Sequence, residues 1–242
     1  MVRTQHLLAD VEAAYDAYRF HYVYRAVYDY IVNDLSAVYM DATKDRVYSE
    51  APDSPRRRAA QTVLMNILEV LAPVLSFTTD EVWEHYPLAM REREGRPSNV
   101  QLAGWPEPSD FLPAVPAAEG ERAAEDFGVI LGVREIVTKA LEDARGEKTV
   151  NKSQEAAVTV TVPRGVLDVL ERYDAAVFEE LFIVASVAFE EGEELAATVA
   201  KTEAEKCPRC WNYRTLGGNP NHPDVCERCG DVLDALGFAE GE

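Results

Sequence analysis

The sequence predicts a mainly α-helical protein, in which a helical bundle is followed by a small α+β unit and a C-terminal four-cysteine zinc ribbon. Three observations predict this fold class. Apolar residues recur at helical spacing through the first half of the chain. β-branched residues begin to alternate with other side chains at Ala156, as is typical of strands. The four cysteines are gathered in two Cys-x-x-Cys pairs near the C-terminus.

Residues 7–45 are predicted to form one long amphipathic helix with a break near Asn33-Asp34. The apolar positions follow i, i+3 and i+4 spacing and show no strand-like alternation. Many of them are tyrosines, and we expect these rings to pack in a helix-bundle core with their hydroxyls at its rim. The positions that define this face are Tyr15, Tyr18, Tyr22, Ala26, Tyr30, Leu35 and Val38.

Two further helices complete the predicted bundle. Pro55 suits the first position of a helix over 56–70, because its ring fixes a helical φ and the first turn does not need its missing N–H. Pro73 should kink or end that helix. The pair Thr78-Thr79 offers a cap for a third helix over 80–86. Three helices with one apolar face each make a helical bundle the simplest architecture.

The second half of the chain predicts smaller elements after a linker. Residues 95–116 are rich in proline, glycine and serine, which indicates a linker or surface loop. The pattern then predicts a helix at 117–145 closed by Gly146, a strand at 156–163, helices at 166–173 and 175–181, and strands at 182–189 and 195–199. We expect three domains: a helical domain with linker at 1–116, an α+β junction domain at 117–200, and the ribbon with its tail at 201–242.

The cysteine pairs predict a structural zinc ion with Cys207, Cys210, Cys226 and Cys229 as ligands. Each pair can place two thiolates on one side of a tetrahedral ion, and four sulfur ligands leave no position for water. Disulfides would require an oxidising compartment, and a redox motif would require one pair beside a βαβ pattern. His222 could replace a cysteine, but its Gly-, Asn- and Pro-rich surroundings are more typical of a solvated turn residue.

The formal net charge of −19 opposes long-range attraction of nucleic acid, because phosphate binding depends on lysine and arginine. The charge is unevenly distributed, however, and basic side chains gather around the cysteines and in several helical segments. Residues 1–20 include charged side chains and no uninterrupted apolar core, so neither a secretion signal nor a membrane span is predicted. We therefore expect a cytoplasmic protein with no membrane partner.

Five segments, in order, resemble the C-terminal part of bacterial isoleucyl-tRNA synthetases, a class I aminoacyl-tRNA synthetase family. DLSAVYMDATKDRVY at 34–48 is similar to the D-L-S-x-x-Y and K-D-R-x-Y signature of the anticodon-binding bundle. APVLSFTTDEVWE at 72–84 resembles the A-P-x-x-x-F-x-x-E-E-x-W run that follows it. Residues 133–142 and 179–186 match the junction segments, and CPRCWNY at 207–213 matches the C-x-R-C-W of the family's ribbon.

The resemblance implies that this chain is the C-terminal fragment of a protein several times longer. It contains neither the H-I-G-H-type nor the K-M-S-K-S-type motif of the family's active site, and no phosphate loop, G-x-S-x-G elbow or H-E-x-x-H helix. We therefore expect no ATP site and no aminoacylation by this chain alone. The implied partners are the anticodon arm of tRNA(Ile) and the parent's catalytic domain, and we expect a monomer.

Contacts to tRNA are expected on the bundle and on the ribbon. Trp211 is the preferred stacking platform, because it follows a ligand cysteine and unstacked RNA bases stack on aromatic rings. The alternative for this ring is a hydrophobic lid over the zinc thiolates. Basic side chains are candidates for phosphate or base contacts, although each could equally form an intramolecular ion pair. These candidates are Lys44, Arg46, Arg56, Arg57, Arg58, Arg209, Arg214 and Arg228.

Three other identities stay open at this point. A valyl or leucyl relative would share the bundle signature, and a DNA-repair glycosylase would share a four-cysteine finger. The third alternative belongs to a different class: a zinc-ribbon module that binds proteins or other nucleic acids and has no role in aminoacylation.

Overall fold

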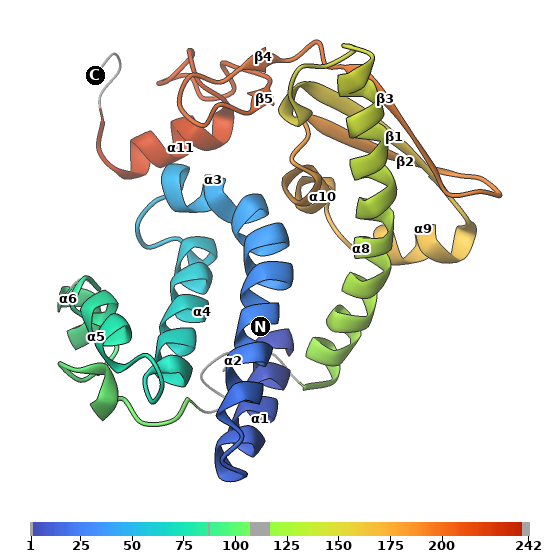
Figure 1. Cartoon of the computed structure of the whole chain (residues 1–242). Helices are drawn as coiled ribbons and strands as arrows, with labels where there is room; N and C mark the ends of the chain where they lie inside the picture. The colour runs from blue at the N-terminus through green and yellow to red at the C-terminus, as the bar shows by residue number, and fades with distance from the viewer. Residues whose placement is uncertain (1, 87, 107–116, 239–242) are drawn as a thin grey trace. The chain divides into compact units, whose positions relative to one another are not determined.

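The computed structural model describes residues 2–86, 88–106 and 117–238, and the chain divides into two compact units (Figure 1). One unit consists of residues 1–37 and 55–121, and the other of residues 38–54 and 122–242. The segment 38–54 therefore belongs to a different unit from the chain on either side of it. The predicted boundary at residue 116 falls in a stretch outside the described residues, and the three-domain division stays a prediction.

The first unit is helical, as the apolar spacing predicted. Its elements are α1 (Val2–Asp16), α2 (Phe20–Asp29), α4 (Pro55–Leu71), α5 (Ser76–Glu84), α6 (Leu88–Arg93) and the 3-10 turn η2 (Val100–Leu102). α1, α2 and α4 share an apolar core in which Val11 and Val23 are fully buried. α4, α5 and η2 share a second core around Trp83, whose Nε1 donates to the Pro97 carbonyl at 3.0 Å.

The break that we expected near Asn33-Asp34 is wrong. The chain instead leaves the helix at residues 17–19, where Tyr18 adopts a φ of +53°. Around the expected break, the residues Tyr30–Met40 form a π-helix, η1, which continues α2 into α3 (Asp41–Ser49). A widened helix keeps the chain helical while changing which side chains face inward.

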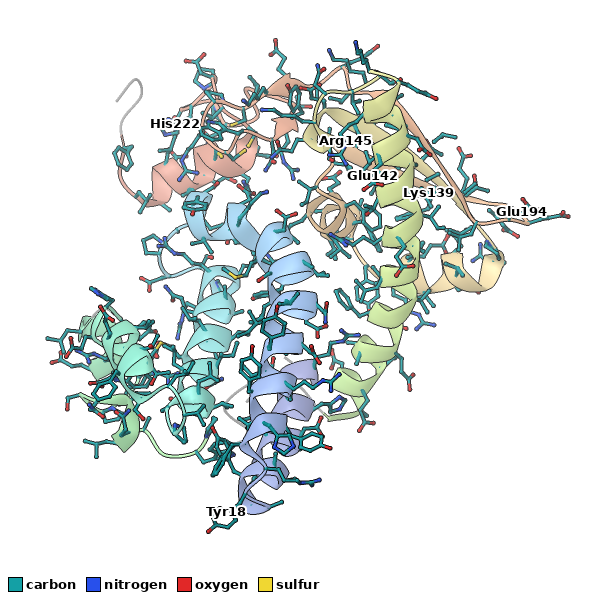
Figure 2. All side chains as sticks on the ribbon, viewed as in Figure 1. Tyr18, Lys139, Glu142, Arg145, Glu194 and His222 are labelled. Atoms are coloured by element: carbon teal, nitrogen blue, oxygen red, sulfur yellow. The ribbon has the colours of Figure 1, made fainter. Side chains whose placement is uncertain are left out.

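The expectation that the tyrosines fill the core holds for only some of them. Tyr30 is buried and shares a 2.6 Å hydrogen bond with the Thr4 hydroxyl. Tyr18 and Tyr22 are 81% and 51% exposed, because the turn after α1 splits the predicted apolar face over two helices. Figure 2 shows Tyr18 at the tip of this turn.

The next two helices differ in how well their starts were predicted. α4 begins at Pro55 and ends at Leu71, two residues before Pro73, as expected. α5 begins at Ser76, four residues before the predicted start, and has no side-chain cap. Thr79 lies inside α5 and donates its hydroxyl to the Leu75 carbonyl at 3.0 Å, so the predicted cap at this position is wrong.

The second unit contains a small sheet packed against helices. Its elements are α3, most of α8 (Ala117–Gly146), η3 (Ser153–Glu155), β1 (Ala156–Val162), α9 (Arg164–Leu170), α10 (Ala175–Phe182), β2 (Ser186–Glu191), β3 (Ala196–Lys201), β4 (Glu205–Lys206), β5 (Tyr213–Arg214) and α11 (Glu227–Ala235). The strand order is β2-β1-β3, with β1 parallel to β2 and antiparallel to β3. α9 and α10 make the crossover that two parallel strands require.

Buried and partly buried side chains alternate along β1, and the buried ones face the core of this unit. Val158, Val160 and Val162 are buried in one cluster with Val137 of α8 and Phe178 of α10. Figure 1 shows α8 running along the sheet. β2 begins later than predicted, because α10 continues through Phe182 and Ile183 closes it with a φ of +59°. The mainly α-helical fold class with a small sheet and a four-cysteine cluster is confirmed. Among the described residues, no helix combines the length and apolar character needed to cross a membrane.

We predict that Trp83→Ala lowers the free energy of unfolding of the first unit by about 3–5 kcal/mol, because the removed ring is fully buried and leaves a cavity. Val82→Ala is the control, since Val82 is 37% exposed and its truncation should cost about 1 kcal/mol or less. Urea denaturation followed by far-ultraviolet circular dichroism measures both. Equal losses for the two variants would contradict the assigned core.

Candidate metal centre and nucleic-acid interface

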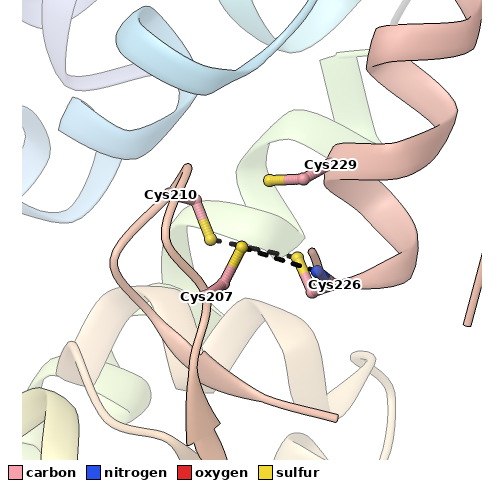
Figure 3. Close-up of side chains that lie close together, drawn as sticks. All are labelled: Cys207, Cys210, Cys226 and Cys229. Carbon is pink, nitrogen blue, oxygen red and sulfur yellow. Dashed lines mark hydrogen bonds between the residues drawn. The ribbon is translucent and has the colours of Figure 1, made fainter. Parts of the chain in front are cut away.

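The four cysteines come from a hairpin and the start of a helix. β4 and β5 pair antiparallel, and the loop between them carries Cys207 and Cys210. Cys226 is the N-cap residue of α11, and Cys229 lies in the first turn of that helix. Figure 3 shows the sulfur atoms of the hairpin loop facing those at the start of α11. The sequence separation of the two pairs is therefore closed by the fold into one cluster.

The sulfur positions fit one tetrahedral zinc ion. All four Sγ atoms lie within 4.8 Å of one another, and Cys210 Sγ is 3.9 Å from Cys226 Sγ. A tetrahedral ion with Zn–S bonds of about 2.3 Å requires sulfur separations of about 3.8 Å. Cys207, Cys226 and Cys229 are buried, so the site is closed to solvent on most sides. Four thiol donors in a closed site are typical of structural zinc.

The electrostatics of the cluster also call for a cation. Hydrogen bonds from Cys210 and Cys226 lower the pKa of the Cys229 thiol to about 3. Hydrogen bonds with Cys210 and Cys229 raise the pKa of the Cys226 thiol above its ordinary value. The thiols therefore compete for the same protons. A divalent cation removes this competition, because it binds the sulfurs as thiolates.

Arg209 of the first cysteine pair lies between the sulfur cluster and α3. Its Nη1 donates to the Ser49 carbonyl at 2.6 Å and to Cys229 Sγ at 3.5 Å. Ser49 is the last residue of α3, where carbonyls have no partner inside the helix. The Arg209 guanidinium donates to one of these carbonyls, and its positive charge interacts favourably with the negative end of the helix dipole.

Arg228 occupies the equivalent place in the second cysteine pair and also reaches α3. Its Nη1 lies 2.5 Å from Asp45 Oδ2, and Ser49 Oγ donates to Asp45 Oδ1 at 2.6 Å. Burial raises the pKa of Asp45, but the hydrogen bonds from Arg228 and Ser49 outweigh it and hold the pKa below its usual range. Asp45 is therefore an anion at neutral pH, as its partner requires.

The other candidate basic residues of the second unit also have acidic partners. Arg46 forms a two-pronged ion pair with Glu180 of α10, with Nη2 2.8 Å from Oε2. Arg214 of β5 lies 3.3 Å from Glu179. Lys44 pairs with Asp41 at 2.8 Å, but both side chains of this pair are about half exposed. Exposed pairs of this kind contribute little stability, so the Lys44 ammonium is the most easily redirected of these charges.

The arginines 56–58 are placed differently. They lie in the first turn of α4, in the first unit, with Arg56 and Arg58 exposed and Arg57 half-buried. The cluster around the cysteines gathers Arg209, Arg228 and α3, all within the second unit. Contact of any of these basic residues with tRNA stays a prediction.

Trp211 follows the second cysteine of the hairpin loop and is 65% exposed. Its φ of +66° is a left-handed conformation that costs a residue with a side chain about 1–2 kcal/mol. Its backbone N–H donates to the Cys207 carbonyl at 2.9 Å, which ties this conformation to the loop that carries the ligands. Lys206 Nζ lies 5.5 Å from the ring centroid. A ring this exposed is presented to solvent and is not a lid over the sulfurs.

His222 is buried, so its expected place as a solvated turn residue is wrong. Figure 2 labels His222 in the zinc-ribbon segment. It is buried, and its Nε2 lies 3.2 Å from Asp234 Oδ1 of α11. Asn219 is also buried and donates to Asp231 and Asp234 at 3.0 and 2.7 Å. These contacts hold the loop between the cysteine pairs against α11, and this histidine is not part of the sulfur cluster.

Sequence reasoning missed three residues of α3 that matter here. Asp45 and Ser49 bond to the arginines of the ribbon, and Tyr48 is 84% exposed. The sequence shows some of the residues involved in these bonds but not that they meet. An arginine occupies the third position of both Cys-x-x-Cys pairs, and an acidic residue at Asp45 precedes Arg46 in the segment that resembles the family signature.

Comparison with known families gives two matches. Residues 1–160 match the model described as "Anticodon-binding domain of tRNA ligase". Residues 204–232 match the model described as "Zinc finger found in FPG and IleRS", and this range contains all four cysteines. The largely helical first two thirds of the chain and the metal centre thus match two different family models.

Similar curated proteins are named isoleucine–tRNA ligase. The chain is 37% identical to the one from Kosmotoga olearia, in an alignment that covers 98% of this chain and 26% of that protein. It is 38% identical to the one from Thermotoga maritima, over 96% of this chain and 25% of that protein. It is 39% identical to the one from Carboxydothermus hydrogenoformans, over 98% of this chain and 26% of that protein. The chain thus spans about a quarter of the length of these relatives.

The fold and the site together define a helical domain joined to a closed four-cysteine zinc finger. The match over 1–160 covers more than half of the chain. The chain belongs to the family of anticodon-binding domains of tRNA ligases.

We predict that Cys226→Ser loses the zinc ion and unfolds the ribbon locally, while the helices of the first unit stay folded. Metal binding at such sites contributes about 10–16 kcal/mol to folding, and the apolar cluster around the cysteines is small. Leu236→Ala is the control, because Leu236 is exposed at the end of α11 and lies outside the sulfur cluster. Elemental analysis should give one zinc per chain for the wild type and the control. Full zinc in Cys226→Ser would contradict the ligand assignment.

Proposed function

We propose that this chain is the tRNA-binding C-terminal region of an isoleucine–tRNA ligase. It would hold the anticodon arm of tRNA(Ile) while the catalytic domain of the parent protein ligates isoleucine to the distant acceptor end with ATP. The chain alone would not aminoacylate. The observation that carries this proposal is the exposed ring of Trp211 beside the zinc site, in a chain of the anticodon-binding family.

The geometry of Trp211 suits an unstacked RNA base. The Trp211 backbone is held by a hydrogen bond to the carbonyl of Cys207, so the cysteine loop fixes the point from which the ring projects. A base that stacks on a fixed ring loses less conformational freedom than one that must order its platform. Lys206 Nζ lies over the ring, 5.5 Å from its centroid, and its positive charge would be available to a phosphate of the stacked nucleotide.

The charge distribution favours short-range recognition. The chain carries a net charge of −19, and Arg46, Arg214 and Arg228 are bonded to acidic side chains. Long-range attraction of a polyanion is therefore weak, and stacking on aromatic rings has to supply much of the affinity. The predicted contacts of Arg56, Arg57 and Arg209 with RNA remain part of this proposal, as does that of Lys44.

Protein binding by a rigid ribbon, with no role in aminoacylation, is the less favoured alternative, because the family match covers the helices as well as the finger. We infer a cytoplasmic location, since four thiols that serve as metal ligands require a reducing compartment. We also infer a monomer that acts together with the parent's catalytic domain.

We predict that Trp211→Ala weakens tRNA(Ile) binding about 5- to 150-fold, which corresponds to loss of about 1–3 kcal/mol of stacking. Zinc content should not change, because the substituted side chain is not a ligand. Trp211→Phe keeps a ring and should retain most of the affinity. Leu236→Ala is the control, since Leu236 is an exposed apolar residue at the end of α11. Fluorescence anisotropy with labelled tRNA measures all four. Equal affinities for wild type and Trp211→Ala would remove this ring from the site.

We further predict a negative slope when the logarithm of the tRNA association constant is plotted against the logarithm of salt concentration. Several arginines near the metal centre are paired with acidic side chains, so we expect a shallow slope between about −1 and −4. The same titration with an unrelated acidic protein as ligand is the control. A salt-independent association, or none at low salt, would favour the protein-binding alternative.

A further inference from the structure

The helix α3 is bound to the ribbon through both cysteine pairs. Arg209 bonds to the carbonyl at its C-terminal end, and Arg228 pairs with Asp45 one turn earlier. Each arginine directly precedes a ligand cysteine, Cys210 or Cys229. Figure 1 shows α3 next to α11, the helix that starts at the second cysteine pair. The position of α3 is thus set by the same residues that surround the metal.

The other anchors of α3 also lie in the second unit. Arg46 is bonded to Glu180 of α10, and Ala42 is buried in the core that contains β1 and α8. Asp45 and Arg228 are both largely buried, with side chains 17% and 28% exposed. These anchors occupy the inward side of the helix, and they explain why 38–54 groups with the second unit.

The outward side of α3 carries a cation and an aromatic ring. Lys44 and Tyr48 are one helical turn apart and therefore share a face. The Tyr48 ring is 84% exposed, and the Lys44 side chain is 49% exposed in a weak surface pair with Asp41. Proteins that bind single-stranded nucleic acid commonly use an exposed aromatic ring to stack on a base and a nearby cation to contact a phosphate. α3 also lies inside the range that matches the anticodon-binding family.

We propose that α3 is a second RNA-contact element, with Tyr48 as a stacking ring and Lys44 as a phosphate contact. Arg209 and Arg228 are the positioning residues that hold it on the metal-bound ribbon. The same tRNA that stacks on Trp211 is the occupant, so this inference rests on the proposed function. Zinc then serves two contact elements, because the cysteine pairs fix both Trp211 and α3.

The first test concerns positioning and needs no RNA. Hydrogen–deuterium exchange of the zinc-loaded chain should show faster exchange in residues 41–49 for Asp45→Asn and Arg228→Gln than for wild type. Asp45→Asn weakens the same Arg228–Asp45 ion pair from the α3 side, without changing a residue next to a cysteine. It therefore remains informative even if Arg228→Gln disturbs the metal site. Arg228→Lys should restore part of the protection. Arg164→Gln, which removes exposed ion pairs of α9, is the control. Unchanged exchange in Asp45→Asn at full zinc would overturn the positioning role.

The second test concerns RNA contact and uses labelled tRNA(Ile). Tyr48→Ala should weaken binding roughly 5- to 150-fold, and Tyr48→Phe should not, because the ring alone stacks. Lys44→Gln should make the salt slope less negative by about one. Asp45→Asn should weaken binding at constant zinc content, although Asp45 faces the ribbon. Val47→Ala is the matched control, because Val47 is a neighbouring exposed residue of α3 without a ring.

The outcomes separate this inference from the proposed function. If wild type binds no tRNA, both are overturned. If Trp211→Ala is weakened while Tyr48→Ala binds like wild type, the proposed function stands and the RNA role of α3 is overturned. That second result is also what a protein partner on this face of α3 would give.

Discussion

Four thiolates within one small cluster cannot coexist without a cation, and the C-terminal part of this protein depends on that constraint. The four sulfur atoms lie within 4.8 Å of one another, so thiolates at these positions repel one another and the protein alone does not favour a fully ionised cluster. The apolar residues packed on the sulfurs are few, and burial alone cannot hold this segment. The metal therefore supplies the free energy that a larger domain would obtain from its core.

The influence of the metal extends beyond its ligands, through the arginines next to them. Arg209 and Arg228 donate to α3 from the two cysteine pairs, so a helix far away in the sequence is fixed by the same cluster. Arg209 also donates to a ligand sulfur, which partly offsets the negative charge that four thiolates place on the ion. The same side chains thus balance the charge of the site and position a neighbouring element.

The acidity of the chain and its membership of an RNA-binding family are compatible on this structure. Most arginines around the metal centre are matched by Asp or Glu partners, so they act within the protein. The side chains presented to solvent include two rings, Trp211 and Tyr48, each with a lysine near it or on the same face. Recognition that depends on such rings requires contact, and it depends less on net charge than recognition by a basic patch does. The left-handed backbone of Trp211 is a local cost that keeps its ring exposed.

The sequence by itself determined the helical class, the presence of a four-cysteine zinc site and the ranges of several elements, because these depend on local spacing. Two Cys-x-x-Cys pairs, Pro55 at a helix start and alternation in β1 are each readable within a few residues. The missed features were decided by contacts between distant segments. The turn at 17–19, the π-helix before α3, the burial of His222 and the bonds from Arg209 and Arg228 to α3 all involve packing that no local pattern records. An arginine beside a cysteine looks the same in the sequence whether it faces RNA or a carboxylate, and only the tertiary structure places Asp45 and Ser49 within its reach.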